Sequence, residues 1–240
     1  MLQIQDLTFG YRKGVNVLDH FSLTIETGGV YGLLGKNGTG KSTLLYLIMG
    51  LLHPQTGRVT YNGIDTRLRN PELLADMFIV PEEYDLPAIS LEKYIKAIRP
   101  FYPRFDEDLM YKCLKDFEMP ENINLGALSM GQKKKVYMCI AIATRTRLLL
   151  MDEPTNGLDI PSKSQFRKIV ASSIDPDQVV IISTHQVRDV ELLLDHVTMI
   201  ERNRVLLHAR MDTLFRDDEV INLEELFYKQ LQTNGGLSHE

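Results

Sequence analysis

The chain has 240 residues, of which 44% are hydrophobic and 25% are charged, and its formal net charge at pH 7 is −5. This length and composition suit one large α/β domain with a sizeable core, and the acidic balance disfavours a protein that coats nucleic acid. No apolar run approaches the roughly 18 residues of a membrane-spanning helix, and the first residues lack the basic and apolar regions of a secretory signal.

The first predicted elements are two antiparallel strands. Residues 2–9 alternate apolar and polar side chains, residues 17–25 show a similar pattern, and Lys13-Gly14 predicts the turn between them. We therefore expect residues 2–30 to form mainly an antiparallel β lobe. Tyr11 can stack on a base or pack at the turn, and the local sequence leaves both interpretations open.

A glycine-rich loop between a predicted strand at 30–34 and a predicted helix at 43–49 carries the strongest functional signal. It fits the pattern G-x-x-x-x-G-K-[ST], in which backbone N–H groups gather around a triphosphate at a helix N-terminus. Lys41 is placed to reach the β- and γ-phosphates, and the Ser42 hydroxyl is placed to bind magnesium. The nucleotide-binding residues expected in this loop are Gly35, Lys36, Asn37, Gly38, Thr39, Gly40, Lys41, Ser42 and Thr43.

Between this loop and the second half of the chain, the pattern changes from strands to helices. Asn62-Gly63 predicts a tight hairpin after a short strand, and residues 77–80 predict another strand. Apolar residues then recur at helical spacing, so we expect residues 84–146 to form an inserted helical lobe. Cys113 and Cys139 lie in these helical patterns without metal-like spacing, which favours buried thiols in a reducing, cytosolic compartment.

A second candidate anion site follows within the lobe. Ser129 and Gln132 have the spacing of a capping box, so Ser129 is predicted to cap a helix from about residue 133 to 145. Together with Gly131, the same geometry can bind an anion through free backbone N–H groups, and the local sequence does not decide between the two roles. The lysines at 133–135 predict a solvated face, which can also raise the positive potential beside that site.

A predicted buried strand at residues 147–154 ends in two carboxylates. Parallel strands bind ligands beyond their carboxyl ends, which places Asp152 and Glu153 at a functional edge. Because side chains alternate along a strand, we expect the two to point in different directions, one holding magnesium and the other polarising water. A solvated loop is the alternative, but burying two adjacent acids without such partners is costly.

The last elements complete the predicted core. Residues 179–184 form an apolar strand followed by His185, which therefore lies at the same sheet edge as the acids. A lone histidine is more often structural, but beside a triphosphate a contact with the γ-phosphate is favoured. Further elements are expected as strands at 196–201 and 205–208, an amphipathic helix at 223–231 and a loose tail at 232–240.

Taken together, these motifs resemble the ATP-binding subunit of an ABC transporter from about residue 2 to about residue 230. The resemblance implies a P-loop NTPase core with a mostly parallel sheet, formed as one ATPase domain over residues 1–231. In the order of the family, the matching segments are Tyr11 for adenine stacking, 35–43 for Walker A, 128–132 for the signature loop, 148–153 for Walker B, 156–159 for the D-loop and His185 for the switch histidine.

The resemblance also implies a mechanism. Two ATPase chains, identical or different, would pair head to tail, with ATP held between Lys41 of one chain and Ser129, Gly131 and Gln132 of the other. Asp152 and Ser42 would hold Mg²⁺, Glu153 would be the general base, and His185 would contact the γ-phosphate. A separate membrane permease would be the partner, so the chain would be cytoplasmic and peripheral on the inner face of the membrane.

Two residues depart from the family pattern. Glu82 stands where the family usually places a glutamine that senses magnesium; it can still ligate the ion, but it adds negative charge. Met130 replaces a glycine of the signature loop, whereas Gly131 is kept. Segments 101–106, 133–135 and 223–227 look like the ABC-2 exporter branch. The alternatives are a soluble ABC-type ATPase of DNA repair or translation and a weakly catalytic nucleotide-dependent regulator.

Overall fold

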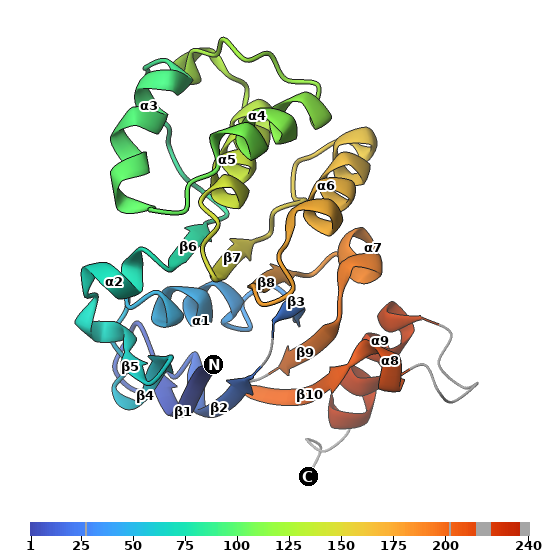
Figure 1. Ribbon diagram of the computed structural model, residues 1–240. Helices are drawn as coiled ribbons and strands as arrows, with labels where there is room; N and C mark the ends of the chain where they lie inside the picture. Colours follow the sequence, from blue (N-terminus) through green and yellow to red (C-terminus); the bar gives the residue numbers. More distant parts are fainter. Residues whose placement is uncertain (27, 202, 215–221, 236–240) are drawn as a thin grey trace.

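A mostly parallel sheet forms the centre of the computed structural model, which describes residues 1–26, 28–201, 203–214 and 222–235 (Figure 1). Its strands lie in the order β10-β9-β3-β8-β7-β6, and only β10 runs antiparallel to its neighbour among the described pairs. The strands are β3 (Gly29–Leu34), β6 (Met77–Val80), β7 (Leu148–Asp152), β8 (Val179–Thr184), β9 (His196–Glu201) and β10 (Arg204–Arg210). This order places the carboxyl ends of β3, β8 and β7 side by side at one edge.

A second, antiparallel sheet has the strand order β2-β1-β4-β5, and the predicted α/β fold with an N-terminal antiparallel part is confirmed. It draws on residues beyond 2–30, because β4 pairs with β1, whereas Gly29 and Val30 already belong to β3. Asn62 and Gly63 both have positive φ, at 51° and 80°, and form the predicted hairpin turn. The strands are β1 (Leu2–Phe9), β2 (Leu18–Ile25), β4 (Thr56–Tyr61) and β5 (Ile64–Asp65).

Helix α1 (Lys41–Ile48) lies between the two sheets and contacts β4 on one side and β7 and β8 on the other. Six of its eight residues are buried, because it is apolar around most of its circumference. Its leucines share one apolar cluster with β1, β3, β4, β7 and β8. The start of α1, which follows the glycine loop, is therefore held by packing on both sides.

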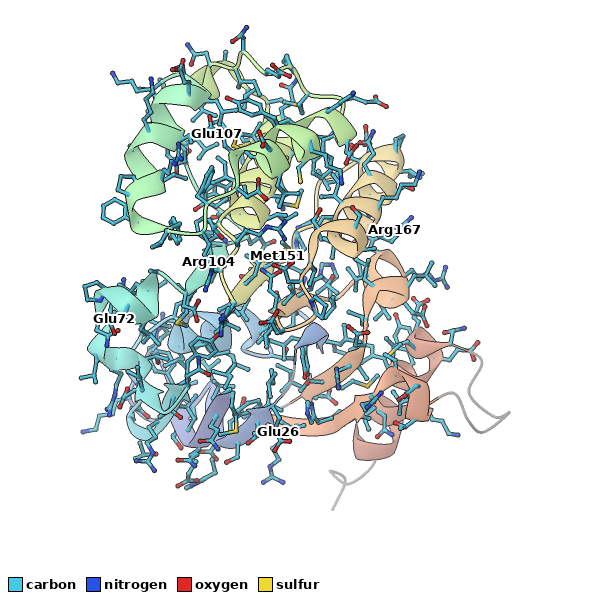
Figure 2. All side chains as sticks on the ribbon, viewed as in Figure 1. Glu26, Glu72, Arg104, Glu107, Met151 and Arg167 are labelled. Atoms are coloured by element: carbon cyan, nitrogen blue, oxygen red, sulfur yellow. The ribbon has the colours of Figure 1, made fainter. Side chains whose placement is uncertain are left out.

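The opposite face of the parallel sheet is covered by helices. Met151 of β7, labelled in Figure 2, is fully buried and belongs to the apolar cluster on this side. Every residue of β7 and β8 is buried, which explains why these strands are continuous apolar runs. The helices on this face are α3 (Leu91–Ile98), α4 (Glu107–Asp116), α5 (Met130–Ala143), α6 (Ile160–Ser173), α7 (Val187–Val190), α8 (Met211–Leu214) and α9 (Leu223–Gly235), whereas Leu73 of α2 (Pro71–Leu74) packs in the apolar cluster around α1.

Helices α3, α4 and α5 form the upper part of the molecule in Figure 1, within the segment where an inserted lobe is expected. Helix α5 begins at Met130 rather than at residue 133, directly after its N-cap Ser129. Residues 232–235 continue α9, and residues 236–240 of the expected tail lie outside the described residues. In the described part of the chain, no helix combines the length and apolar character needed to cross a lipid bilayer.

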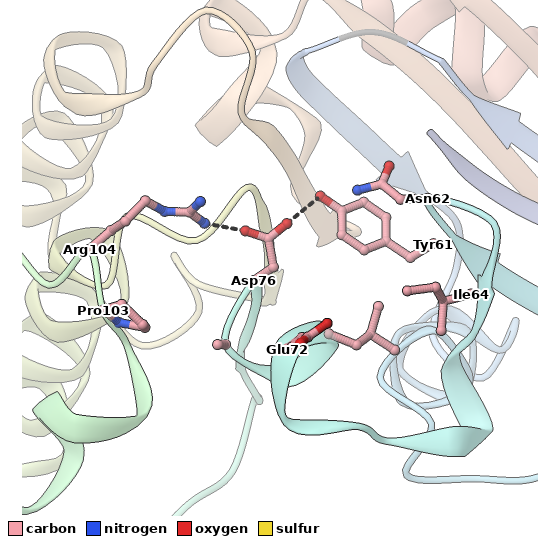
Figure 3. A pocket seen from close by; sticks show the side chains of 9 residues that line it. Tyr61, Asn62, Ile64, Glu72, Asp76, Pro103 and Arg104 are labelled. Carbon is pink, nitrogen blue, oxygen red and sulfur yellow. Dashed lines mark hydrogen bonds and ion pairs between the residues drawn. The ribbon is translucent and has the colours of Figure 1, made fainter.

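The helical lobe is tied to both sheets at a pocket of about 340 Å³ (Figure 3). Arg104 forms an ion pair with Asp76, which precedes β6, and its Nε donates to the Arg145 carbonyl at 2.9 Å. The Tyr61 hydroxyl of β4 donates to the same Asp76 carboxylate at 3.4 Å. Burial, followed by the charge of Asp76, raises the pKa of Tyr61. One carboxylate therefore joins the lobe, the parallel sheet and the antiparallel sheet.

We expect the substitution Asp76→Ala to lower the free energy of unfolding by about 1–2 kcal/mol, because it leaves the Arg104 and Tyr61 donors without this acceptor. For a domain of this size, the melting temperature should fall by about 2–8 °C. Glu72→Ala is the matched control, since Glu72 is exposed and lines the same pocket. Equal melting temperatures for the two variants would contradict the bridging role of Asp76.

Candidate functional site

The glycine-rich loop joins β3 to α1 and folds around the side chain of Lys41. The Lys41 ammonium is buried and donates to the carbonyl oxygens of Gly35 at 2.8 Å and Lys36 at 3.2 Å. Gly38 and Gly40 have φ values of 81° and 95°, which side chains rarely adopt. Gly40 is the N-cap of α1 and supplies no side chain, so the first backbone N–H groups of the helix face the loop.

A buried carboxylate stands opposite this lysine. Glu153 is 4% exposed, and its Oε1 atom lies 3.6 Å from the Lys41 ammonium. The same oxygen accepts from the backbone N–H of His185 at 3.1 Å and lies 2.8 Å from its Nδ1, while Oε2 accepts from the Thr184 hydroxyl at 3.1 Å. Burial lowers the pKa of Lys41, and the charges of Glu153 and Asp152 oppose that shift. The end of β8 therefore fixes the Glu153 side chain beside the loop.

Asp152 lies at the end of β7 and is fully buried. Its Oδ1 accepts a hydrogen bond from the Ser183 hydroxyl, whereas its buried Oδ2 has no hydrogen-bond partner among the described residues. Burial raises the pKa of Asp152; the hydroxyls of Ser183 and Ser42 act in the opposite direction, and the charges of Glu82 and Glu153 add to the rise. The site thus contains a buried carboxylate oxygen that no described residue satisfies by a hydrogen bond.

Asp152 and Glu153 were expected to point in different directions, and in the structure they have different hydrogen-bond and ion-pair partners. Both carboxylates lie by the glycine-rich loop at residues 35–43, called the phosphate loop below, Asp152 near Ser42 and Glu153 near Lys41. The strand alternation ends at Asp152, because Glu153 follows β7 with a φ of 46° and turns its side chain back toward the loop.

Lys41, Glu153 and His185 line a cavity of about 440 Å³, and Asp152 is not among the described residues that line it. Tyr11 stands at its rim with 63% of its surface exposed, and its hydroxyl is 3.1 Å from that of Thr43. Glu82 stands at another part of the rim, where its Oε1 accepts from the Asn156 side-chain amide at 3.0 Å. The lining residues are Tyr11, Val17, Asn37, Gly38, Gly40, Lys41, Ser42, Thr43, Glu82, Glu153, Asn156 and His185.

The expected second anion site, formed by Ser129, Gly131 and Gln132, does not line this cavity in the described part of the chain. Ser129 and Gln132 form the predicted capping box, in which the Ser129 side chain accepts from Gln132 N at 3.3 Å and the Gln132 side chain accepts from Ser129 N at 3.0 Å. Neither of them, nor Gly131, is among the described residues that line the cavity. Met130 and Ile160, at the starts of α5 and α6, are 64% and 83% exposed.

Comparison with known proteins identifies the family of this chain. Residues 18–156 match the ABC transporter family. The chain belongs to this family. It is 28% identical over 231 residues to the ABC transporter ATP-binding protein YtrB of Bacillus subtilis, which covers 95% of this chain and 77% of that protein. It is 31% identical over 212 residues to the SkfA peptide export ATP-binding protein SkfE of the same organism, with 86% and 87% covered.

A solved structure of an ATP-binding subunit of an ABC transporter has the same fold, with a TM-score of 0.83 and 24% sequence identity. The match covers 96% of this chain and 99% of that one. The chain is thus an ABC ATP-binding subunit with ATPase activity coupled to transport, and such subunits work with membrane permease components.

This ABC subunit also contains a site residue that the sequence analysis missed. Lys134 was expected on a solvated face, but it is only 8% exposed and donates to the carbonyl oxygens of Glu153 at 3.0 Å and Asn156 at 2.9 Å. The expectation is wrong because Lys134 lies on the buried face of α5, where its ammonium reaches these two carbonyl oxygens. Its spacing from Met138 and Ala141, both buried apolar residues, was the available signal.

We expect Asp152→Asn to raise the melting temperature of the nucleotide-free protein near neutral pH, because it removes a buried charge beside Glu153. Because the pKa of Asp152 is raised, its carboxyl group binds a proton more tightly in the folded protein than in the unfolded chain. The contribution of Asp152 to stability therefore falls as the pH rises through this raised pKa. The advantage of Asp152→Asn should therefore shrink as the pH is lowered. The exposed residue Asp85 provides the control, Asp85→Asn, and a melting temperature no higher than that of the control would contradict the analysis.

Proposed function

We propose that this chain hydrolyses ATP at an interface between two ATPase subunits, identical or different, and thereby drives a separate membrane permease. The observation that supports the proposal is that the expected ATP-binding residues lie at two separate places in the chain. The phosphate loop, Glu153 and His185 surround one cavity, whereas Ser129 and Gly131 occupy a capped helix start outside it. A second chain, facing the first head to tail, would bring its own helix start over the bound triphosphate.

The reaction needs a cradle, a base and a contact for the γ-phosphate. Lys41 would leave its partner Glu153 for the phosphate oxygens, since a triphosphate is the stronger anionic partner. The freed Glu153 carboxylate, still held by Thr184 and His185, would accept a proton from the attacking water. His185 would contact the γ-phosphate, and Tyr11 would stack on the adenine ring. Most of the acceleration would come from positioning and electrostatic stabilisation.

The residues present also fit a magnesium ion. Asp152 offers the unpartnered Oδ2, the Ser42 hydroxyl lies close to that carboxylate, and Glu82 lines the cavity together with Ser42. No group of three His, Cys, Asp or Glu side chains that could hold a metal occurs in the described part of the chain. The ion would therefore complete its oxygen ligands with phosphate and water, as Mg²⁺ does at nucleotide sites. It would neutralise charge on the transferred phosphoryl group.

The wider setting is part of the same proposal. Residues 1–231 act as one ATPase domain on the inner, cytoplasmic face of the membrane, and the permease selects the cargo. We favour export, by an ABC-2 type of transporter, because one of the similar proteins is named for peptide export. Opening of the two-chain interface after hydrolysis would be the movement passed to the permease.

The substitution Glu153→Gln tests the base and the two-chain site together. We expect kcat to fall about 100-fold or more, because a general base contributes at least that factor. ATP binding should persist, and the variant should elute as a dimer in size-exclusion chromatography with ATP. Lys41→Ala is the contrasting variant, for which calorimetry should give an ATP affinity lower by about tenfold or more. A monomeric Glu153→Gln protein that still hydrolyses ATP would contradict the proposal.

The substitution Glu82→Gln tests the departure at the metal site. Loss of this charge should raise the Mg²⁺ concentration that gives half-maximal ATPase rate by about two- to tenfold. Glu83→Gln is the matched control on the neighbouring exposed residue. Identical Mg²⁺ titrations of the two variants would show that Glu82 takes no part in binding the ion.

A further inference from the structure

Lys134 is a buried cation that the proposed mechanism does not use. It lies on α5, is 8% exposed and follows Gln132 of the capping box by two residues. Its ammonium donates to two backbone carbonyl oxygens on another segment, those of Glu153 and Asn156. Burying a lysine is costly unless its charge is compensated, so these contacts call for an explanation.

The two carbonyls belong to one tight turn after β7. The backbone N–H of Asn156 donates to the Glu153 carbonyl at 3.1 Å, which closes the turn, and Lys134 Nζ binds that same carbonyl oxygen at 3.0 Å. The second bond of Lys134, at 2.9 Å, holds the carbonyl at the other end of the turn. One ammonium group therefore fixes both ends of a four-residue segment that starts with a positive φ at Glu153.

This turn sets the position of two acidic side chains. Glu153 extends from its first residue toward Lys41 and His185. The side-chain amide of its last residue, Asn156, donates to Glu82 at 3.0 Å. A shift of the turn would therefore move the Glu153 carboxylate and release Glu82 at the same time.

The surrounding charges are consistent with this placement. Burial lowers the pKa of Lys134, and the negative charges of Glu82, Glu153 and Asp152 oppose the shift. Lys134 thus supplies a positive charge close to three carboxylates that would otherwise repel one another. The extra negative charge that Glu82 brings to this site accordingly has a compensating cation nearby.

We propose that Lys134 is a positioning residue for ATP hydrolysis, which holds the turn from Glu153 to Asn156 so that the Glu153 carboxylate keeps its place beside Lys41 and His185. The inference rests on the proposed function, in which Glu153 is the base. Because Lys134 lies on α5, whose N-cap is Ser129, it also joins the capped start of this helix to the turn from Glu153 to Asn156 in the same chain.

The test compares Lys134→Met with Lys133→Met, its neighbour on the same helix, which is half-buried. Lys134→Met removes the ammonium but keeps a long side chain. Its kcat should fall about 10- to 100-fold, as expected when a catalytic group is displaced by about an ångström. Affinity for a fluorescent ATP analogue should stay within about threefold of the unmodified protein, because the phosphate loop is untouched. Lys133→Met should keep both values.

A conservative variant separates positioning from folding. Lys134→Gln keeps two N–H donors on a shorter side chain, so its kcat should lie between those of the unmodified protein and Lys134→Met. If Lys134→Met does not fold, Lys134→Gln carries the test against Lys133→Gln, with kcat lower by about threefold or more at unchanged affinity. Equal kcat values in that pair, or a parallel loss of kcat and nucleotide affinity, would overturn the inference.

Glu153→Gln distinguishes this inference from the function on which it rests. If Glu153→Gln hydrolyses ATP at the unmodified rate, the assignment of the base fails, whatever Lys134 does. If Glu153→Gln is inactive while Lys134→Met and Lys133→Met have the same kcat, only the role of Lys134 is overturned.

Discussion

The buried ion pair between Lys41 and Glu153 is the interaction on which the site depends. It joins a loop after β3 to the end of β7, and the intervening strand β8 contributes Thr184 and His185 to the same carboxylate. A buried ion pair is stable only when further hydrogen bonds satisfy both partners. Here the lysine has two backbone carbonyls, and the glutamate has a hydroxyl, an N–H group and an imidazole.

The fold stabilises this ion pair because separate contacts hold the phosphate loop, which carries Lys41, and the turn after β7, which carries Glu153. Helix α1 is packed between the antiparallel and parallel sheets, so the phosphate loop at its start has little freedom. On the other side, the turn after β7 is fixed by α5 through Lys134. The helical lobe is joined to both sheets by Asp76 at the opposite ends of the strands. Rigid supports of this kind are what catalytic geometry requires.

Local patterns in the sequence predicted much of this architecture. Apolar runs located the strands of the parallel sheet, the hairpin at Asn62-Gly63 followed from turn chemistry, and the capping box placed the start of α5 within a few residues. The features that escaped prediction depend on tertiary contacts. The pairing of β4 with β1 joins distant segments, the positive φ of Glu153 overrides strand alternation, and Lys134 lies in a charge run that indicated solvent. For the site, the loop, acids and histidine were recognisable from motifs, whereas their mutual distances were not.

The separation of the cavity from the capped start of α5 has a consequence for how the protein behaves in solution. Under the proposed arrangement, each chain carries the cavity and the capped start of α5, but these two parts do not meet within one chain. ATP hydrolysis would therefore require that two chains associate. Specific activity would then rise with protein concentration until pairing saturates, by mass action. A permease that binds two such chains side by side would raise their local concentration, so that pairing would no longer depend on their concentration in solution. The abundance of the membrane partner, more than that of this chain, would then set the rate of ATP consumption.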